Sequence, residues 1–163
     1  MSNRDATRPG EIEAPLPARS DAHLVFIGRI RTPFPDRDAC PRQGRLDGPE
    51  CRIEIDDPWR QGLRGLEVYG FVEVLYWMHL ARRDLVVQNP KCSGETTGTF
   101  ALRSPLRPNP IATQRAAIVS VGADHLIVRG LDCIDGTPLL DLKPERCGYS
   151  PPAPDHAGKT SGP

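Results

Sequence analysis

The residues Phe71-Val72-Glu73-Val74-Leu75-Tyr76-Trp77-Met78-His79-Leu80 give the clearest β-strand signal in the chain. Aromatic and β-branched side chains dominate this run, and both kinds favour extended backbone. Apolar residues stand at successive positions as well as at alternate ones, which is typical of a strand covered on both faces. The run therefore predicts a central strand of a β-sheet.

Further strand signals lie on both sides of this run, bounded by Gly, Pro, Asn and Asp residues. They cover residues 23–30, 51–55, 97–102, 116–121, 125–131 and 139–142. Gly122-Ala123-Asp124 separates two of them and predicts a hairpin. A short helix is expected over 58–66, with Asp57 as N-cap and Pro58 at the first helical position. About seven short strands with short helical insertions indicate an all-β barrel or sandwich.

The two ends of the chain read differently from its middle. Residues 1–22 are rich in Pro, Ala and charged residues without apolar periodicity, and residues 148–163 are rich in Pro. We therefore expect a flexible N-terminal extension, one folded domain over 23–147, and a flexible Pro-rich tail. No apolar run is long enough to span a membrane, and the start lacks the apolar core of a signal peptide. These features predict a cytoplasmic protein.

The amino-acid composition limits the classes of function that the protein can have. The net charge is zero, and 3 of the 21 basic residues are Lys, which leaves 18 Arg. This skew suits nucleic-acid binding, but a GC-rich genome would explain it equally well. The five cysteines show no C-x-x-C spacing, which argues against a disulfide framework and a zinc ribbon, and no metal is expected. The chain has no dinucleotide fingerprint, P-loop or nucleophile elbow.

Two stretches carry the candidate chemistry. Residues 103–111, Arg-Ser-Pro-Leu-Arg-Pro-Asn-Pro-Ile, hold three prolines that stiffen a loop bearing two arginines and an asparagine. A rigid connection with solvated arginines is the alternative reading. Residues 130–144 place Asp132 between apolar neighbours, where its carboxylate requires a partner from the protein or a ligand. In the same stretch Asp135 suits a turn cap, and Asp141 and Lys143 suit a surface pair.

These stretches belong to a longer series of motifs that resembles the TsaA-like family, also called TrmO or YaeB. The resemblance covers about residues 24 to 145. The matching segments are Ile27–Phe34, Pro41-Arg42-Gln43, Gly65-Leu66-Glu67, Val74–Leu80, Gly98–Ile111 and Gly130–Pro144. The strings R-S-x-x-R-P-N-P-I and L-D-x-x-D-G-T-P-x-x-D-x-K-P are long and specific.

The resemblance implies a β-barrel that binds S-adenosyl-L-methionine, acts as a homodimer and methylates N6 of a threonylcarbamoyladenosine next to the anticodon of a tRNA. It also implies a set of cofactor contacts: Pro41, Arg42, Gln43, His79, Leu80, Arg103, Thr113, Asp132, Cys133, Ile134 and Asp135. An aspartate can pair with the ammonium or ribose hydroxyls of such a cofactor, and Arg103 can bind its carboxylate.

The resemblance leaves the general base and the RNA contacts open. The target N–H must lose a proton, and His79 or Asp135 is a candidate acceptor, although a lone His at a strand end is more often structural. Candidate contacts to tRNA are Arg31, Arg42, Arg107, Asn109 and Lys143.

The sequence departs from the family pattern at Ala112-Thr113-Gln114 and at Glu145, and it has a Pro-rich tail where many members carry a further domain. Two alternatives therefore stay open. One is a methyltransferase that acts on another RNA or a small molecule. The other is a non-enzymatic module that binds the cofactor or RNA.

Overall fold

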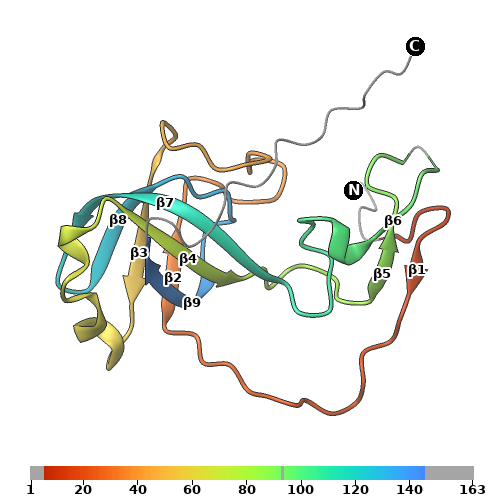
Figure 1. The fold of residues 1–163 in the computed structure, drawn as a ribbon, viewed down its shortest axis with the longest axis horizontal. Helices are drawn as coiled ribbons and strands as arrows, with labels where there is room; N and C mark the ends of the chain where they lie inside the picture. Colours follow the sequence, from red (N-terminus) through yellow and green to blue (C-terminus); the bar gives the residue numbers. More distant parts are fainter. Residues whose placement is uncertain (1–5, 93, 146–163) are drawn as a thin grey trace.

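Six antiparallel strands form a closed barrel in the computed structural model, which describes residues 6–92 and 94–145. Around the barrel the strands follow the order β2, β3, β8, β7, β4, β9 (Figure 1). Their bounds are β2 Gly28–Arg31, β3 Glu50–Ile55, β4 Phe71–Trp77, β7 Ile111–Val121, β8 His125–Arg129 and β9 Thr137–Pro144. The predicted all-β barrel and the β7–β8 hairpin are confirmed.

Strand β4 lies between β7 and β9, as its apolar sequence predicts. Its inward-facing side chains Val72, Val74 and Tyr76 are at most 3% exposed. They pack with a core drawn from the other barrel strands, including Ile30, Ile53, Leu126, Val128 and Leu139. The strand ends at Trp77, three residues earlier than predicted, because the chain turns there with the Ala81 N–H donating to the Met78 carbonyl.

The region between β3 and β4 contains two short 3-10 helices, η1 (Trp59–Leu63) and η2 (Leu66–Val68). The prediction of one helix begun by Asp57 is wrong in detail. Pro58 occupies the N-cap position, and Asp57 forms an ion pair with Arg60 at 3.0 Å. Leu63 and Leu66 anchor the two helices in the barrel core.

A second, smaller sheet lies beside the barrel (Figure 1). It consists of β1 (Ile12–Glu13), β5 (Leu85–Gln88) and β6 (Thr97–Gly98), followed by a third 3-10 helix, η3 (Thr99–Ala101). The predicted strand 97–102 thus stops after two residues, because the buried Thr99 hydroxyl donates to the Leu85 carbonyl and accepts from Gln88 Nε2. These bonds tie η3 to β5.

Part of the segment predicted as a flexible N-terminal extension is paired in this structure. Ile12 of β1 pairs with Val87 of β5, and Arg82 Nη2 donates to Glu13 Oε1 at 2.7 Å. A strand of two residues that is held by side-chain contacts is too short to produce a periodic pattern in the sequence. Residues 146–163, which include the predicted tail, lie outside the described residues.

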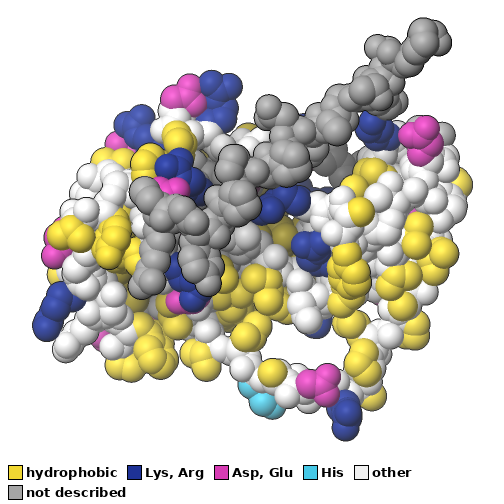
Figure 2. Space-filling view, viewed as in Figure 1, with side chains coloured by type: hydrophobic (Ala, Val, Ile, Leu, Met, Phe, Trp, Pro, Cys, Tyr) yellow, Lys and Arg dark blue, Asp and Glu magenta, His cyan; other side chains and the backbone are white. Residues whose placement is uncertain are grey.

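The chain between β1 and β2 has no strand, so the first barrel strand begins at Gly28 and not at residue 23. Leu24, Val25 and Phe26, which suggested the earlier start, are 45–63% exposed. In Figure 2 an opening separates this connecting segment from the rest of the molecule, with hydrophobic side chains along it. No helix within residues 6–92 and 94–145 is long and apolar enough to cross a membrane.

Candidate functional site

The predicted site segments meet where β4 ends and β7 begins. Trp77 of β4 pairs with Ile111 of β7, so the turn after β4 lies next to the loop that precedes β7. This turn carries His79 and Leu80, and the loop is the proline-rich stretch 103–111. The D-x-x-D segment, 132–135, reaches the same strand end through Asp132.

Asp132 joins two of these segments. Its Oδ1 accepts from the Tyr76 hydroxyl at 2.9 Å, and its Oδ2 accepts from the Gly44 N–H at 3.1 Å. Burial, and then the charge of Asp132, raises the pKa of Tyr76, so the phenol remains a neutral donor. The partner that the sequence required for Asp132 is therefore supplied by the protein, and the carboxylate anchors the loop after Pro41.

Glycine is required at position 44 for this anchoring. A Cβ placed there would lie 1.8 Å from the Gly130 carbonyl oxygen and 3.0 Å from Gln114 Nε2. The 41–44 loop thus packs directly on the segment before Asp132 and on β7, within the stretch where the sequence departs from the family. Residues 41–43 themselves are exposed.

Asp135 contacts the chain after β2. Its Oδ1 accepts from the Thr32 N–H at 3.0 Å, and its Oδ2 lies 3.8 Å from Arg31 Nη1. Arg31 also donates to Glu54 at 3.0 Å, a bond that raises the pKa of its guanidinium. Asp135 therefore orders a neighbouring loop through Thr32, and Arg31, predicted to contact RNA, is occupied by two carboxylates.

The two residues between these aspartates are also held by the protein. The Cys133 carbonyl accepts from the Thr32 hydroxyl at 2.8 Å, and the Ile134 carbonyl accepts from the Thr137 hydroxyl at 2.6 Å. Burial raises the pKa of the Cys133 thiol to about 12, so this thiol stays protonated. The segment presents fixed backbone and one exposed carboxylate, that of Asp135.

The two arginines of the proline-rich loop make different contacts. Arg103 is exposed, and its Nη2 donates to the Thr113 carbonyl at 3.2 Å, which brings two predicted cofactor contacts together. Arg107 folds back instead, donating from Nη2 to the carbonyls of Leu102 at 2.8 Å and Thr99 at 3.2 Å. Its buried Nε has no hydrogen-bond partner among the described residues. Arg107 thus supports the loop from within.

The remaining predicted residues are at the surface. His79 and Leu80 are exposed, Leu80 by 61%. The predicted Asp141–Lys143 pair is confirmed at 2.6 Å, and it raises the pKa of Lys143. Glu145, one of the departures from the family pattern, forms an ion pair with Arg115.

Sequence reasoning missed Arg83, which contacts the proline-rich loop. Its Nε donates to the Pro108 carbonyl at 2.6 Å, and its Nη2 donates to Asn109 Oδ1 at 3.3 Å. The Arg82-Arg83 pair just after the central strand was the only available signal in the sequence.

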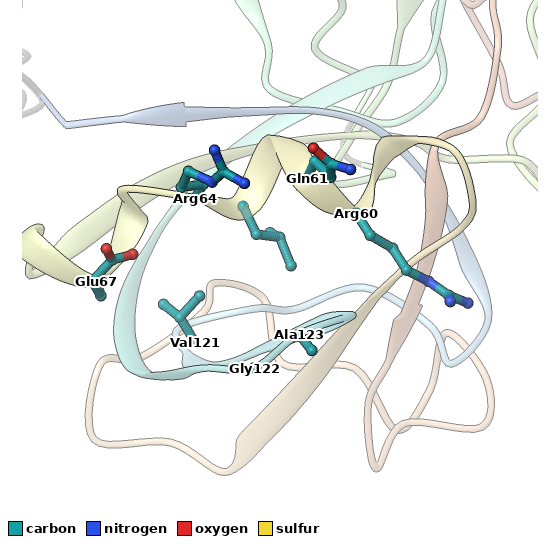
Figure 3. Close-up of a pocket in the computed structure, with 8 residues that line it drawn as sticks. Arg60, Gln61, Arg64, Glu67, Val121, Gly122 and Ala123 are labelled. Atoms are coloured by element: carbon teal, nitrogen blue, oxygen red, sulfur yellow. The ribbon is translucent and has the colours of Figure 1, made fainter.

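Hollows occur elsewhere on the barrel. One of about 340 Å³ lies between η1 and the β7–β8 turn and is lined by Arg60, Gln61, Leu63, Arg64, Glu67 and residues 121–123 (Figure 3). It is at the opposite end of β7 from Ile111. Residues 6–92 and 94–145 contain no group of three or more His, Cys, Asp or Glu side chains able to hold a metal ion.

Comparisons with known proteins agree with this arrangement. A family model described as the tRNA-methyltransferase O N-terminal domain matches residues 29–149. The probable S-adenosyl-L-methionine-binding protein VirR of Rhizobium radiobacter is 48% identical over 90% of this chain and 84% of its own length. The tRNA (adenine(37)-N6)-methyltransferase of Mus musculus is 34% identical over 77% of this chain and 31% of its own length.

The fold has solved counterparts. A crystal structure of TrmO from Pseudomonas aeruginosa aligns with a TM-score of 0.71 and 30% identity over 89% of this chain. The alignment covers 64% of that protein, so this chain matches just under two thirds of it. The family match over most of the barrel and the identity to VirR lead to one conclusion: the chain belongs to the TrmO family.

Proposed function

We propose that the protein is an S-adenosyl-L-methionine-dependent methyltransferase that methylates N6 of adenosine 37 in a tRNA. The observation that carries the proposal is the convergence of three motif segments at one strand end. Asp132 links the 41–44 loop to Tyr76, and Arg103 links the proline-rich loop to Thr113. Family membership and the name of the mouse relative, a tRNA (adenine(37)-N6)-methyltransferase, support the choice of reaction.

The exposed groups at this strand end suit the cofactor. Arg103 commits one described hydrogen bond to Thr113, which leaves N–H groups of its planar fork for a carboxylate. The exposed carboxylate of Asp135 suits the ammonium or ribose hydroxyls. Prolines in the 103–111 loop and the anchoring of Gly44 keep these groups in place before binding, which lowers the entropic cost of binding.

The bound cofactor would supply a methyl group on a sulfonium, whose departure as a neutral sulfide needs little assistance. The protein's task is then to hold the acceptor nitrogen in line and to receive its proton. His79 is the better acceptor, because it is exposed on the turn after β4. Both oxygens of Asp135 already face Thr32 and Arg31.

Fewer side chains are available to contact the tRNA than the sequence suggested. Arg31 and Arg107 are engaged within the protein, and Lys143 is paired with Asp141. Arg42 is exposed and has no interaction with the other described residues, so it is the strongest candidate for a phosphate contact. Asn109 retains its amide NH₂ as a donor, since its Oδ1 accepts from Arg83.

A homodimer in the cytoplasm completes the proposal. Leu80 is 61% exposed and Ile111 is 39% exposed at the candidate site, and a second copy would cover such apolar surface. The alternative of a module that only binds the cofactor remains, because several relatives are named for S-adenosyl-L-methionine binding alone.

The decisive experiment combines purified protein, methyl-labelled cofactor and tRNA from a strain that lacks this methylation. We expect label in the modified adenosine next to the anticodon after nucleoside digestion. Arg103→Ala should abolish the transfer, whereas Arg64→Ala, at the far end of the barrel, serves as the matched control. Cofactor binding without label in any tRNA nucleoside would reject the enzymatic proposal and favour the binding module.

A further inference from the structure

Two chain segments cross side by side from the barrel to the small sheet (Figure 1). Residues 78–84 follow β4, and residues 102–110 precede β7. The Met78 N–H donates to the Pro110 carbonyl at 2.9 Å, which fastens the crossings at the barrel. The first segment includes the predicted cofactor contacts His79 and Leu80, and the second includes the proline-rich loop. The distance between the two segments therefore determines the shape of the candidate site.

Arg83 forms the second fastening between the crossings. Its guanidinium reaches the opposite segment through the Pro108 carbonyl, 2.6 Å from Nε, and Asn109 Oδ1, 3.3 Å from Nη2. The guanidinium carbon also lies 5.2 Å from the centre of the Trp77 ring, within the range of a cation–π contact. The Arg83 side chain is half-buried, and its planar guanidinium contacts a backbone carbonyl, a side-chain amide and an aromatic ring at the same time.

We propose that Arg83 is a positioning residue for the cofactor site. It holds the C-terminal half of the proline-rich loop against the end of β4, so that Arg103 and His79 keep their spacing before any ligand binds. The role of this spacing in cofactor binding rests on the proposed function, whereas the fastening itself does not.

Other contacts leave this task to Arg83. The first half of the loop is held on the small-sheet side, by Arg107 through the Leu102 carbonyl and by Gln88 of β5, whose Nε2 donates to the Leu106 carbonyl at 2.6 Å. Neither contact ties the loop to residues 78–84, which carry His79. Pro108 and Asn109 lie beyond both of these contacts. Removal of Arg83 should therefore loosen residues 108 and 109, whereas the bond from Met78 to Pro110 and the barrel should remain.

Lysine is not an adequate substitute at this position. An ammonium group can retain the contact with Trp77 and one hydrogen bond, but it lacks the planar fork that serves two acceptors together. The amide exchange and the cofactor affinity of Arg83→Lys should thus lie between those of the wild type and Arg83→Ala. If only the positive charge mattered, Arg83→Lys would behave like the wild type.

Amide hydrogen exchange tests the fastening without any ligand. Arg83→Ala should raise exchange about ten-fold in peptides that cover 78–84 and 103–111, because local opening there becomes easier. Exchange in β3 and β8 should not change, Arg83→Lys should be intermediate, and Arg64→Ala should match the wild type. Unchanged exchange in both crossings would overturn the proposal.

Calorimetry and kinetics test the consequence for the cofactor. Arg83→Ala should weaken S-adenosyl-L-methionine binding about ten-fold by lowering the fraction of protein in the binding-competent state. At saturating cofactor kcat should stay near that of the wild type, so that the loss appears in KM.

A double-mutant cycle separates positioning from independent effects. If Arg83 acts by placing Arg103, Arg83→Ala should cost less in an Arg103→Lys background than in the wild type. Fully additive losses would overturn the positioning role. If the wild type binds no cofactor, the proposed function fails, and the exchange result alone decides whether Arg83 fastens the loop.

Discussion

The hydrogen bond from Tyr76 to Asp132 should make a measurable contribution to stability, and Tyr76→Phe removes it without emptying the core. Tyr76 is 3% exposed, and the 2.9 Å bond ends on a carboxylate oxygen. A hydrogen bond to a charged group contributes about 1.5–3 kcal/mol, and the lower end applies because water can reach the half-buried Asp132. A loss of about 1.5 kcal/mol lowers the Tm of a domain of this size by about 3–6 °C.

Urea unfolding followed by circular dichroism measures this loss, and Tyr69→Phe is the matched control. Tyr69 is 41% exposed, so losing its hydroxyl should change the free energy of unfolding by less than about 0.5 kcal/mol. Equal stability of the two variants would refute the anchoring role of Tyr76. Cofactor binding should weaken in Tyr76→Phe alone, because Asp132 also holds the Gly44 N–H.

The same pair of variants gives a test against pH. The raised pKa of Tyr76, caused by burial and then by the charge of Asp132, keeps the phenol protonated in the folded state. In the unfolded chain it ionises near pH 10, so its contribution is complete below about pH 10 and falls by roughly 1.4 kcal/mol per pH unit above it. Tyr76→Phe should show a shallower alkaline decline than Tyr69→Phe, and identical slopes would contradict this reasoning.

Three further changes probe the loop, the core and the N-terminal strand. Gly44→Ala should displace the 41–44 loop, because the new Cβ would meet the Gly130 carbonyl oxygen, and weaken cofactor binding about ten-fold in calorimetry; wild-type affinity would show that this loop is not part of the site. Leu126→Ala, at a fully buried position, should cost about 3 kcal/mol in urea unfolding, and a loss below about 1 kcal/mol would contradict its place in the core. Glu13→Gln should speed proteolysis of residues 6–13, because Thr7 and Arg82 hold the Glu13 carboxylate through hydrogen bonds that lower its pKa. In the wild type this protection should be present above the ordinary glutamate pKa, about 4.3, and fade as pH falls, and a pH-independent rate would be the contrary result.

The barrel strands were accessible from sequence because each carries its own signal. Phe71–Trp77 and the β7–β8 hairpin have apolar patterns and turn residues that local chemistry explains. The small sheet has no such signal. Strands β1 and β6 are two residues long, and long-range contacts beside them support their pairing with β5, such as the bonds from Arg82 to Glu13 and from Gln88 to Thr99. A sheet that is held by single contacts between residues far apart in the chain leaves no apolar periodicity from which it could be predicted.

The candidate site shows the same division. The sequence indicated that Asp132 needs a partner, but not that the partner is Tyr76, which is 56 residues away along the chain. It indicated a stiff proline-rich loop, but not that Arg83 and Arg107 supply part of the stiffness. Residue type predicts which bonds a side chain must form, and the fold decides with which partner.

The excess of arginine over lysine now has a structural explanation that does not involve RNA. Many of the described arginines form ion pairs with carboxylates, namely Arg19, Arg31, Arg45, Arg52, Arg60, Arg82, Arg115 and Arg129. Others donate to backbone carbonyls, namely Arg8, Arg29, Arg83, Arg103 and Arg107. A planar fork suits these tasks in a barrel with long loops and few helices.

Within residues 6–92 and 94–145, Arg42 and Arg64 are the arginines whose side chains have no hydrogen bond or ion pair with other described residues. They lie at opposite ends of the barrel, Arg42 beside the anchored Gly44 and Arg64 beside the hollow at the β7–β8 turn. An arginine side chain that folding does not use is free to bind a phosphate, and of these two only Arg42 lies next to the candidate site. The composition of the chain therefore says little about its partner, whereas the single unpaired arginine of the 41–44 loop marks the place where we propose that a tRNA backbone approaches.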